Sequence, residues 1–231
     1  MVGMTLFHAD HISVSHVRDG RAVPLFHDAC LRLEGGLIYD LTGASGSGKS
    51  TLLRACALMI ARDAGSLYLQ GRSSDGFGPQ EWRRQVCLVP QQPALVAGTV
   101  RDNLVLPWHL KVNAASQPPS DGELARLLCL AGLEEVELSR DASRLSGGQQ
   151  ARVALLRSFA TKPKVFLLDE VDAALDSASS QAISRLTRDY VGSDATCLRI
   201  RHRSADGYAA GTYTLEDGAL SYVAAGSGGR S

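Results

Sequence analysis

A glycine-rich segment between an apolar run and a helical pattern constrains the fold of this chain more than any other feature. Gly43–Ser50 reads Gly-Ala-Ser-Gly-Ser-Gly-Lys-Ser and fits the pattern G-x-x-x-x-G-K-[S/T]. Leu37–Leu41 predicts a short strand before it, and Ser50–Ile60 predicts a helix after it. Strand, glycine loop and helix form one half of a βαβ unit, so the segment predicts an α/β fold. An ordinary Gly/Ser-rich loop would match this pattern in about one chain of this length per hundred.

The residues of this segment suit the binding of phosphate groups. Glycines let the backbone curl so that several N–H groups point at one anion, and the start of the following helix adds the positive end of its dipole. We expect Lys49 to reach the β- and γ-phosphates of a nucleotide and the Ser50 hydroxyl to ligate Mg²⁺. The residues expected to contact the nucleotide here are Gly43, Ala44, Ser45, Gly46, Ser47, Gly48, Lys49, Ser50 and Thr51.

An apolar run that ends in two carboxylates adds a second part to the predicted site. Lys164–Leu168 is typical of a strand buried on both faces, and Asp169 and Glu170 follow at its C-terminal end. Ligands of α/β sheets bind beside the C-terminal ends of strands. Asp169 can therefore hold Mg²⁺, directly or through water, and Glu170 can polarise a water for attack on the γ-phosphate. Alone, the pair would be interpreted as a capped strand end, but the phosphate loop favours the functional interpretation.

The pentapeptide Leu145–Gln149, Leu-Ser-Gly-Gly-Gln, is the most specific feature of the chain. Its chance occurrence is on the order of a few in ten thousand for such a length. One serine and two glycines precede a helical pattern and form a second anion-binding nest. Because one phosphate loop already surrounds a triphosphate, the second nest can serve the same nucleotide only from another subunit or from far across the chain. The expected contacts are Ser146, Gly147, Gly148 and Gln149.

With these motifs in this order, the chain resembles the nucleotide-binding subunit of ATP-binding cassette (ABC) transporters over Ile12–Tyr222. The resemblance implies that Gly43–Ser50 is the Walker A motif, Leu145–Gln149 the signature and Val165–Asp169 the Walker B motif. In the family, two such domains pack head to tail and hold two ATP molecules between the Walker A motif of one and the signature of the other. The implied ligands are ATP and Mg²⁺, and the implied activity is transport-coupled hydrolysis of ATP.

The resemblance also assigns roles outside the three motifs. Gln91, in Val89-Pro90-Gln91-Gln92-Pro93, matches the Q-loop glutamine that senses Mg²⁺ and γ-phosphate and moves a helical insert. Asp176 ends the D-loop and is expected beside the nucleotide. His202 matches the switch histidine that contacts the γ-phosphate. The implied catalytic residues are Lys49, Gln91, Glu170 and His202, and the implied metal ligands are Ser50, Gln91 and Asp169.

Four residues depart from the family pattern. His16 stands where an aromatic side chain usually stacks on adenine, and it is interpreted either as a weaker stacking platform or as an ordinary surface residue. Asp172 stands where Thr or Ser is common; it could raise the pKa of Glu170 by repulsion, but the default is a solvent-facing cap. Arg199 and Arg201 stand where the strand is usually more apolar, which leaves the register of that strand open.

The remaining pattern predicts a single ABC ATPase domain with an N-terminal antiparallel β subdomain and an inserted helical subdomain. We expect an α/β core over about 1–98 and 141–223, the helical subdomain over about 99–140, and a disordered tail over 224–231. Met1–Gly36 is expected to be rich in strands. Further strands are expected at Ser66–Leu69, Val86–Val89 and Thr196–Ile200, with a closing hairpin of Thr212–Leu215 and Ala219–Val223. The expected helices are Thr99–Lys111, Asp121–Ala131, Leu133–Ser139, Gln149–Thr161 and Ser177–Tyr190.

Composition excludes several functions. The 231 residues carry 24 basic and 24 acidic side chains, so nothing indicates a surface for nucleic acid. No window of about 18 apolar residues and no signal peptide are present, which predicts a chain that does not itself cross a membrane. The five cysteines are scattered, which is typical of buried, reduced thiols in the cytoplasm.

We therefore expect a cytoplasmic subunit on the inner face of the cell membrane, with a separate integral-membrane permease as partner. Thr99–Trp108 resembles the equivalent stretch of bacterial iron-exporter ATP-binding subunits, chiefly in its Leu-Pro-Trp, which makes metal export a candidate function. Trp108 is interpreted either as an anchor for the permease or as packing within the helical insert. The alternatives are a soluble ABC-type ATPase of DNA repair or translation and a non-catalytic regulatory subunit. No long heptad pattern supports the first, and the intact motifs argue against the second.

Overall fold

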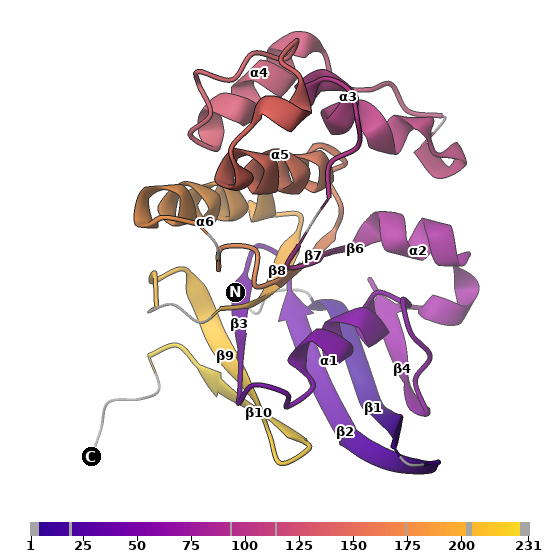
Figure 1. Cartoon of the computed structure of the whole chain (residues 1–231). Helices are drawn as coiled ribbons and strands as arrows, with labels where there is room; N and C mark the ends of the chain where they lie inside the picture. Colours follow the sequence, from indigo (N-terminus) through magenta and orange to yellow (C-terminus); the bar gives the residue numbers. More distant parts are fainter. Residues whose placement is uncertain are drawn as a thin grey trace.

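Two β-sheets with helices between and above them make up the structure (Figure 1). The computed structural model describes residues 5–18, 20–92, 94–113, 115–173, 175–201 and 205–226. The first sheet has the strand order β2-β1-β4-β5, and the second has the order β10-β9-β3-β8-β7-β6. The expected class, an α/β core with an antiparallel β subdomain and a helical insert, is confirmed.

The first sheet is antiparallel and is built mainly from the N-terminus. Its strands are β1 (Thr5–Arg18), β2 (Arg21–Glu34), β4 (Ala64–Leu69) and β5 (Arg72–Ser73). In β2 the side chains alternate between buried and exposed from Ala29 to Leu33, because one face of the sheet packs on the core and the other faces solvent. The expectation that Met1–Gly36 is rich in strands is confirmed for its described residues.

The second sheet holds the parallel strands that position the site. These are β3 (Ile38–Thr42), β6 (Val86–Val89), β7 (Val165–Asp169) and β8 (Thr196–Ile200), which pair in parallel in the order β3-β8-β7-β6. β9 (Ala209–Glu216) also runs parallel to β3 and forms the predicted hairpin with β10 (Ala219–Ala224). All five residues of β7 are buried, which explains the unbroken apolar run because both faces of this strand are covered.

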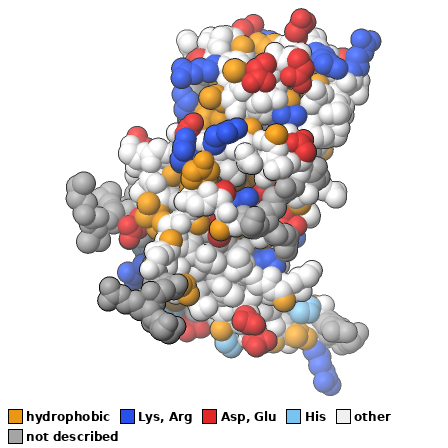
Figure 2. Space-filling model, turned by 90° about the vertical axis from the view of Figure 1, so that its left-hand side faces the viewer, with side chains coloured by type: hydrophobic (Ala, Val, Ile, Leu, Met, Phe, Trp, Pro, Cys, Tyr) orange, Lys and Arg blue, Asp and Glu red, His pale blue; other side chains and the backbone are white. Residues whose placement is uncertain are grey.

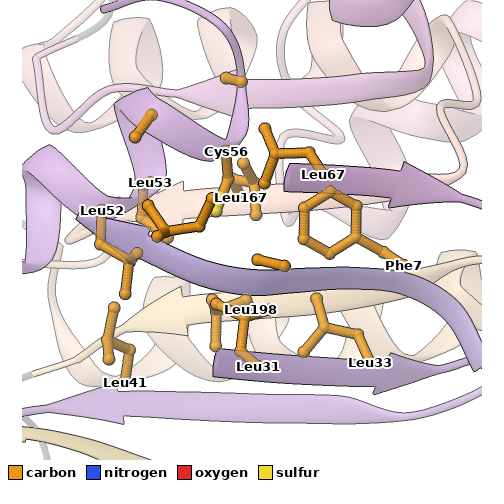
Figure 3. Close-up of a cluster of buried hydrophobic side chains, with 14 of the residues drawn as sticks. Phe7, Leu31, Leu33, Leu41, Leu52, Leu53, Cys56, Leu67, Leu167 and Leu198 are labelled. Carbon is orange, nitrogen blue, oxygen red and sulfur yellow. The ribbon is translucent and has the colours of Figure 1, made fainter. Parts of the chain in front are cut away.

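Two apolar clusters lie on opposite faces of the parallel strands. The first fills the space between the two sheets around helix α1 (Lys49–Cys56) (Figure 3). It joins Leu52 and Cys56 of α1 to Leu31 of the first sheet and Leu167 of the second. The second cluster joins Phe166 of β7 to helices α5 (Gly147–Ala160) and α6 (Ser177–Val191) and to the helical insert. α1 and α5 therefore cover opposite faces of the sheet.

The helical insert differs in detail from the prediction. The expected helix Thr99–Lys111 is α3 (Val100–Val105) followed by single 3-10 turns at Leu106–His109 and Lys111–Asn113. Pro107, the second residue of the first turn, lacks an N–H and cannot continue the hydrogen bonding of the α-helix. The expected helix Asp121–Ala131 is α4 (Asp121–Leu130).

The predicted helix Leu133–Ser139 is wrong. Gly132 has a φ of +66°, a left-handed value that ends α4, and two turns follow in which the N–H groups of Val136 and Arg140 bond the carbonyls three residues before them. Leu133 and Val136 are buried, so spacing typical of a helix is satisfied by turns. A further helix, α2 (Pro79–Gln85), was not predicted.

The chain end and the cysteines bring two smaller corrections. Ala224 belongs to β10 rather than to a tail, and residues 227–231 lie outside the described part of the chain.

Cys56 and Cys197 are buried thiols as expected, and burial raises the pKa of each to about 12. Cys30 and Cys129 are exposed, so the expectation of burial is wrong for them. All five cysteines are free.

No helix among the described residues is long and apolar enough to cross a membrane. On the face shown in Figure 2, acidic and basic side chains are interspersed over the helical end of the molecule.

Candidate nucleotide-binding site

The phosphate loop connects the end of β3 to the start of α1 and has room only for glycine at two positions. Gly43 has a φ of +141°, and a Cβ there would lie 2.2 Å from the carbonyl oxygen of Leu215. Gly48 has a φ of +103°, and its Cβ would lie 2.9 Å from Leu25 of β2. The loop is thus curled tightly against both sheets, which agrees with the reason for expecting glycines at these positions.

Two side chains of the loop have polar groups suited to an anion. Lys49 is 7% exposed, and its Nζ donates to the carbonyl oxygens of Gly43 at 2.9 Å and Ala44 at 2.8 Å. No ion pair of Lys49 occurs within the described residues. The hydroxyl of Ser47 is buried and has no hydrogen-bond partner within the described part of the chain. The ammonium of Lys49 is buried without a carboxylate partner among the described residues, and the Ser47 hydroxyl could donate a hydrogen bond. Both groups suit a negatively charged ligand with oxygen atoms, such as a triphosphate.

The expected metal ligands lie side by side although they are far apart in the sequence. The Ser50 hydroxyl, in the first turn of α1, donates to Oδ1 of Asp169 at 2.8 Å. Asp169 ends β7 and is buried. A hydroxyl and a carboxylate at one point are oxygen donors of the kind that Mg²⁺ prefers, so these residues fit the ion.

Glu170 and Gln91 contact each other next to this pair. Nε2 of Gln91 donates to Oε2 of Glu170 at 2.9 Å, and Gln91 follows the end of β6, the strand paired with β7. Glu170 has a φ of +53°, a value uncommon for residues with a side chain. The turn directs the carboxylate of Glu170 toward Gln91 instead of continuing β7.

The signature pentapeptide leads into helix α5; Ser146 and Gly147 are exposed, whereas Leu145 is buried. Ser146 is the N-cap: its Oγ accepts from the Gln149 N–H at 3.3 Å, and Oε1 of Gln149 accepts from the Ser146 N–H at 2.9 Å. The first-turn N–H groups of Gly147 and Gly148 have no acceptor within the helix, as at any helix start. Because α5 covers the face of the sheet opposite α1, the two nests are not joined within one chain.

Three other predicted residues have different surroundings. Asp176 caps α6, since Oδ1 accepts from the Ser179 N–H at 2.8 Å, and this bond lowers the pKa of Asp176. His16 is exposed near the end of the β1–β2 hairpin, where it pairs with Val23, two residues from the Leu25 that packs on Gly48. His202 lies outside the described residues.

The unusual charges of the chain are buried and paired. The register of β8 is settled, because Arg199 lies opposite Asp40 of β3 and its Nε donates to Oδ1 of Asp40 at 2.7 Å. The preferred interpretation of Asp172 as a solvent-facing cap is wrong. Asp172 is 5% exposed and accepts hydrogen bonds from Arg201 and Ser180. Sequence reasoning missed these pairs, because the sequence patterns do not show which strands lie side by side.

Trp108 packs against the second apolar cluster, and its Nε1 is buried without a partner among the described residues. This supports packing within the helical insert over an exposed anchor. Leu110, two residues further along the chain, is 59% exposed.

The structure resembles solved ATP-binding cassettes. One, described as the ATP binding subunit of an ABC transporter, superposes with a TM-score of 0.82 over 96% of this chain and 90% of that one, at 22% identity. Another is the ATP-binding cassette MJ0796 in a dimeric post-hydrolysis state bound to ADP and Pi. It superposes with a TM-score of 0.80 over 95% of this chain and 98% of that one, at 23% identity. At this level of identity the likeness supports the fold.

Sequence comparison shows the family. The profile of the ABC transporter family matches residues 26–173. YjkB of Bacillus subtilis (strain 168), named as an ABC transporter ATP-binding protein, is 36% identical over 75% of this chain and 67% of its own. FetA of Escherichia coli (strain K12), named "Probable iron export ATP-binding protein", is 34% identical over 69% of both chains. MetN 1 of Pseudomonas savastanoi pv. phaseolicola (strain 1448A / Race 6), named as a methionine import ATP-binding protein, is 35% identical over 72% of this chain and 50% of its own.

The chain belongs to the ABC transporter family and is an ATP-binding subunit of such a transporter. It binds ATP and is an ATPase, as the family implies. YjkB, FetA and MetN 1 are all named for transport, which favours this interpretation over an ATPase of DNA repair or translation.

Proposed function

We propose that this chain hydrolyses MgATP at the interface of a head-to-tail dimer and drives a separate integral-membrane permease from the cytoplasmic side. The main observation behind the proposal is that three separate segments of the chain bring their polar side chains close together. The phosphate loop supplies Lys49 and Ser50, the end of β7 supplies Asp169 and Glu170, and the segment after β6 supplies Gln91. These groups match the parts that phosphoryl transfer to water needs.

Each residue has a proposed role in binding that follows from its chemistry. Lys49 would exchange the carbonyls of Gly43 and Ala44 for β- and γ-phosphate oxygens, which form stronger charge-assisted bonds. Ser50, Asp169 and Gln91 would hold Mg²⁺, which neutralises charge on the phosphates. The backbone of Gly43–Thr51 would surround the phosphates, and His16 would lie beside the base.

Glu170 is the candidate general base, because it lies one residue beyond the metal ligand Asp169. Gln91 donates to it and so orients the carboxylate from a second segment. Ser146, Gly147, Gly148 and Gln149 of a second copy would close the site over the γ-phosphate, and Asp176 and His202 complete the proposed contacts.

ATP hydrolysis by the purified chain tests this assignment. Lys49→Ala removes the cation that faces the phosphates, so hydrolysis should be lost and ATP affinity should fall by at least about tenfold, or roughly 1.4 kcal/mol. A phosphate-release assay and calorimetry with ATP measure the two effects. Turnover near that of the unaltered chain would refute the role of this loop.

A groove beside the helical insert is the proposed docking surface for the permease. It has a volume of about 540 Å³, and the described residues that line it include Arg83, Leu110, Lys111 and Arg157. Nη2 of Arg157 donates to the carbonyl of Ala94, three residues beyond Gln91, which ties the groove to the segment that leads to the site. A basic groove with an exposed leucine suits a short helix with acidic and apolar side chains.

Leu110→Asp should place a charge in this groove and weaken recovery of the permease by at least about tenfold. The measurement is pull-down from solubilised membranes with mass spectrometry of integral-membrane proteins. Val223→Asp on β10 is the matched control, because Val223 is similarly exposed but lies outside the groove. Equal recovery with both variants would place the permease elsewhere.

For the transported substrate, metal export is the candidate that the Leu106–Trp108 stretch and the likeness to FetA support. MetN 1 is similar to the same degree and is named for methionine import. Cellular iron and methionine uptake, measured with and without the gene, separate the two.

A further inference from the structure

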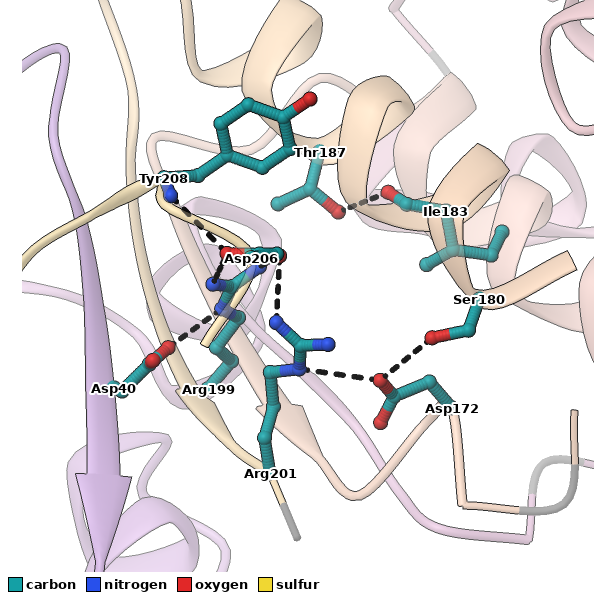
Figure 4. A network of polar contacts seen from close by, with 9 residues as sticks. All are labelled: Asp40, Asp172, Ser180, Ile183, Thr187, Arg199, Arg201, Asp206 and Tyr208. Carbon is teal, nitrogen blue, oxygen red and sulfur yellow. Dashed lines mark hydrogen bonds and ion pairs between the residues drawn. The ribbon is translucent and has the colours of Figure 1, made fainter. Parts of the chain in front are cut away.

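Five charged side chains form a buried network beside the proposed site (Figure 4). Two arginines at the end of β8, Arg199 and Arg201, contact three aspartates that come from different segments: Asp40, Asp172 and Asp206. None of the five belongs to the proposed nucleotide contacts. Buried charges are costly unless they are paired, so the network must hold its segments in a fixed arrangement.

One half of the network joins Arg199 of β8 to Asp206. Arg199 donates to Oδ2 and Oδ1 of Asp206 at 3.0 and 2.8 Å and is itself 4% exposed. Burial acts to raise the pKa of Asp206, but the hydrogen bonds and charge of Arg199 outweigh it and lower that pKa to about 2. Asp206 is therefore an anion at neutral pH, tied to the central strands.

Arg201 forms the other half and joins two loops. Its Nε donates to Oδ2 of Asp172 at 3.2 Å, and its Nη1 lies 2.5 Å from Oδ2 of Asp206. Asp172 also accepts from the Ser180 hydroxyl of α6 at 3.1 Å. Arg201 thereby connects the end of β8 both to Asp206 and to the loop that follows β7.

Asp172 lies two residues after Glu170, whose backbone needs external support. The left-handed φ of Glu170 is held by a turn in which the Ala173 N–H donates to the Glu170 carbonyl at 3.1 Å. A second turn bonds the Leu175 N–H to the Asp172 carbonyl at 3.2 Å. Uncommon backbone conformations persist only where neighbouring contacts enforce them. The side chain of Asp172, fixed by Arg201 and Ser180, is such a contact.

We propose that Arg201 and Asp172 are positioning residues whose buried ion pair fixes the carboxylate of Glu170 relative to the end of β8. The two residues are both departures from the family pattern, and the structure shows that they complement each other. The pair acts through Glu170, so it governs the hydrolytic step and leaves nucleotide binding unchanged. The inference rests on the proposed role of Glu170 as general base.

The test replaces both charges at once, because removing one alone would leave its partner buried and uncompensated. The variant Asp172→Asn with Arg201→Met keeps the sizes of both side chains. We expect a kcat at least about tenfold lower than that of the unaltered chain, with the Kd for ATP within about twofold. As a control, Arg101→Met with Asp121→Asn makes the same two substitutions in an exposed ion pair, whose nitrogen–oxygen distance is 2.7 Å, and should leave kcat unchanged.

A second variant covers the case in which the double variant unfolds, as judged by its thermal melting. Arg201→Lys keeps the positive charge but loses the planar fork that reaches two carboxylates. It should lower kcat several-fold at constant Kd for ATP. Unchanged kcat in the folded variants, or an equal loss of affinity and turnover, would overturn the positioning role. Failure of the unaltered chain to hydrolyse ATP would instead refute the proposed function.

Discussion

Lys49 differs from Arg199 and Arg201 in the groups that compensate its charge. Each of these arginines contacts aspartates, whereas the ammonium of Lys49 contacts two backbone carbonyls among the described residues. Carbonyl dipoles compensate a buried charge less well than a carboxylate or a phosphate does. An anion in the loop would compensate Lys49 better than these carbonyls do, which supports the proposal that Lys49 faces the phosphates.

His16 is expected to contribute little to nucleotide binding. Its side chain is exposed on the β1–β2 hairpin, and an imidazole covers less of a base than a phenol ring does. His16→Ala should therefore change the Kd for ATP by less than about tenfold, measured by calorimetry. His16→Tyr, which restores the larger ring, should tighten binding. A much greater loss with alanine would show that His16 is a true stacking platform.

The residues of contiguous motifs could be predicted from the sequence, but the buried pairs could not. Gly43–Ser50 and Asp169–Glu170 follow from local rules, because strand, turn and helix signals surround them. Arg199 and Asp40 are separated by 159 residues, and their pairing depends on β8 lying beside β3. Asp172 was likewise expected to face solvent, because its partner Arg201 is 29 residues away and local patterns do not reveal the contact.

Helix α2 shows how tertiary packing determines an element that local patterns leave uncertain. Its seven residues carry one buried side chain, Trp82, which packs against Phe7 and Phe77. The indole Nε1 donates to the carbonyl of Cys56 at 2.9 Å, which satisfies a group near the end of α1. A helix this short has no recognisable period, so its sequence predicted no element. Leu133–Ser139 is the reverse case, because apolar spacing there favoured a helix that Gly132 prevents.

Trp82→Ala should strongly destabilise the fold. The side chain is fully buried, so the loss of packing and of the Cys56 hydrogen bond should lower the free energy of unfolding by about 3–5 kcal/mol. Urea denaturation followed by circular dichroism measures this. Trp82→Phe keeps most of the ring contacts and loses only the hydrogen bond, so it should cost about 1–3 kcal/mol. Equal stability of the alanine variant and the unaltered chain would contradict the packing role of α2.

At the scale of the whole molecule, the two helix starts that suit phosphate lie on opposite faces of one sheet. α1 and its phosphate loop cover one face of the parallel sheet, and α5 with the signature at its start covers the other. The two starts of one chain are therefore not placed to contact the same nucleotide, and the proposed dimer would let a second copy supply the missing half of each site. The sequence could predict this arrangement only through the resemblance, because no local pattern says which surface a second chain covers.

The shared site is tested most directly by the oligomeric state of Glu170→Gln. Glutamine keeps the size of the side chain but removes its basicity, so ATP should bind and persist. A ligand that bridges two subunits shifts the equilibrium toward the dimer by mass action. Adding Ser146→Arg should abolish the dimer by filling the nest. That change also removes an N-cap worth about 1 kcal/mol, so its thermal melting must be compared.

Size-exclusion chromatography with light scattering measures the oligomeric state of each variant. The account predicts that Glu170→Gln is a monomer without nucleotide or with ADP, a dimer with ATP, and a monomer with ATP when Ser146→Arg is added. A dimer that forms without ATP, or a monomer of Glu170→Gln at saturating ATP, would contradict the shared site.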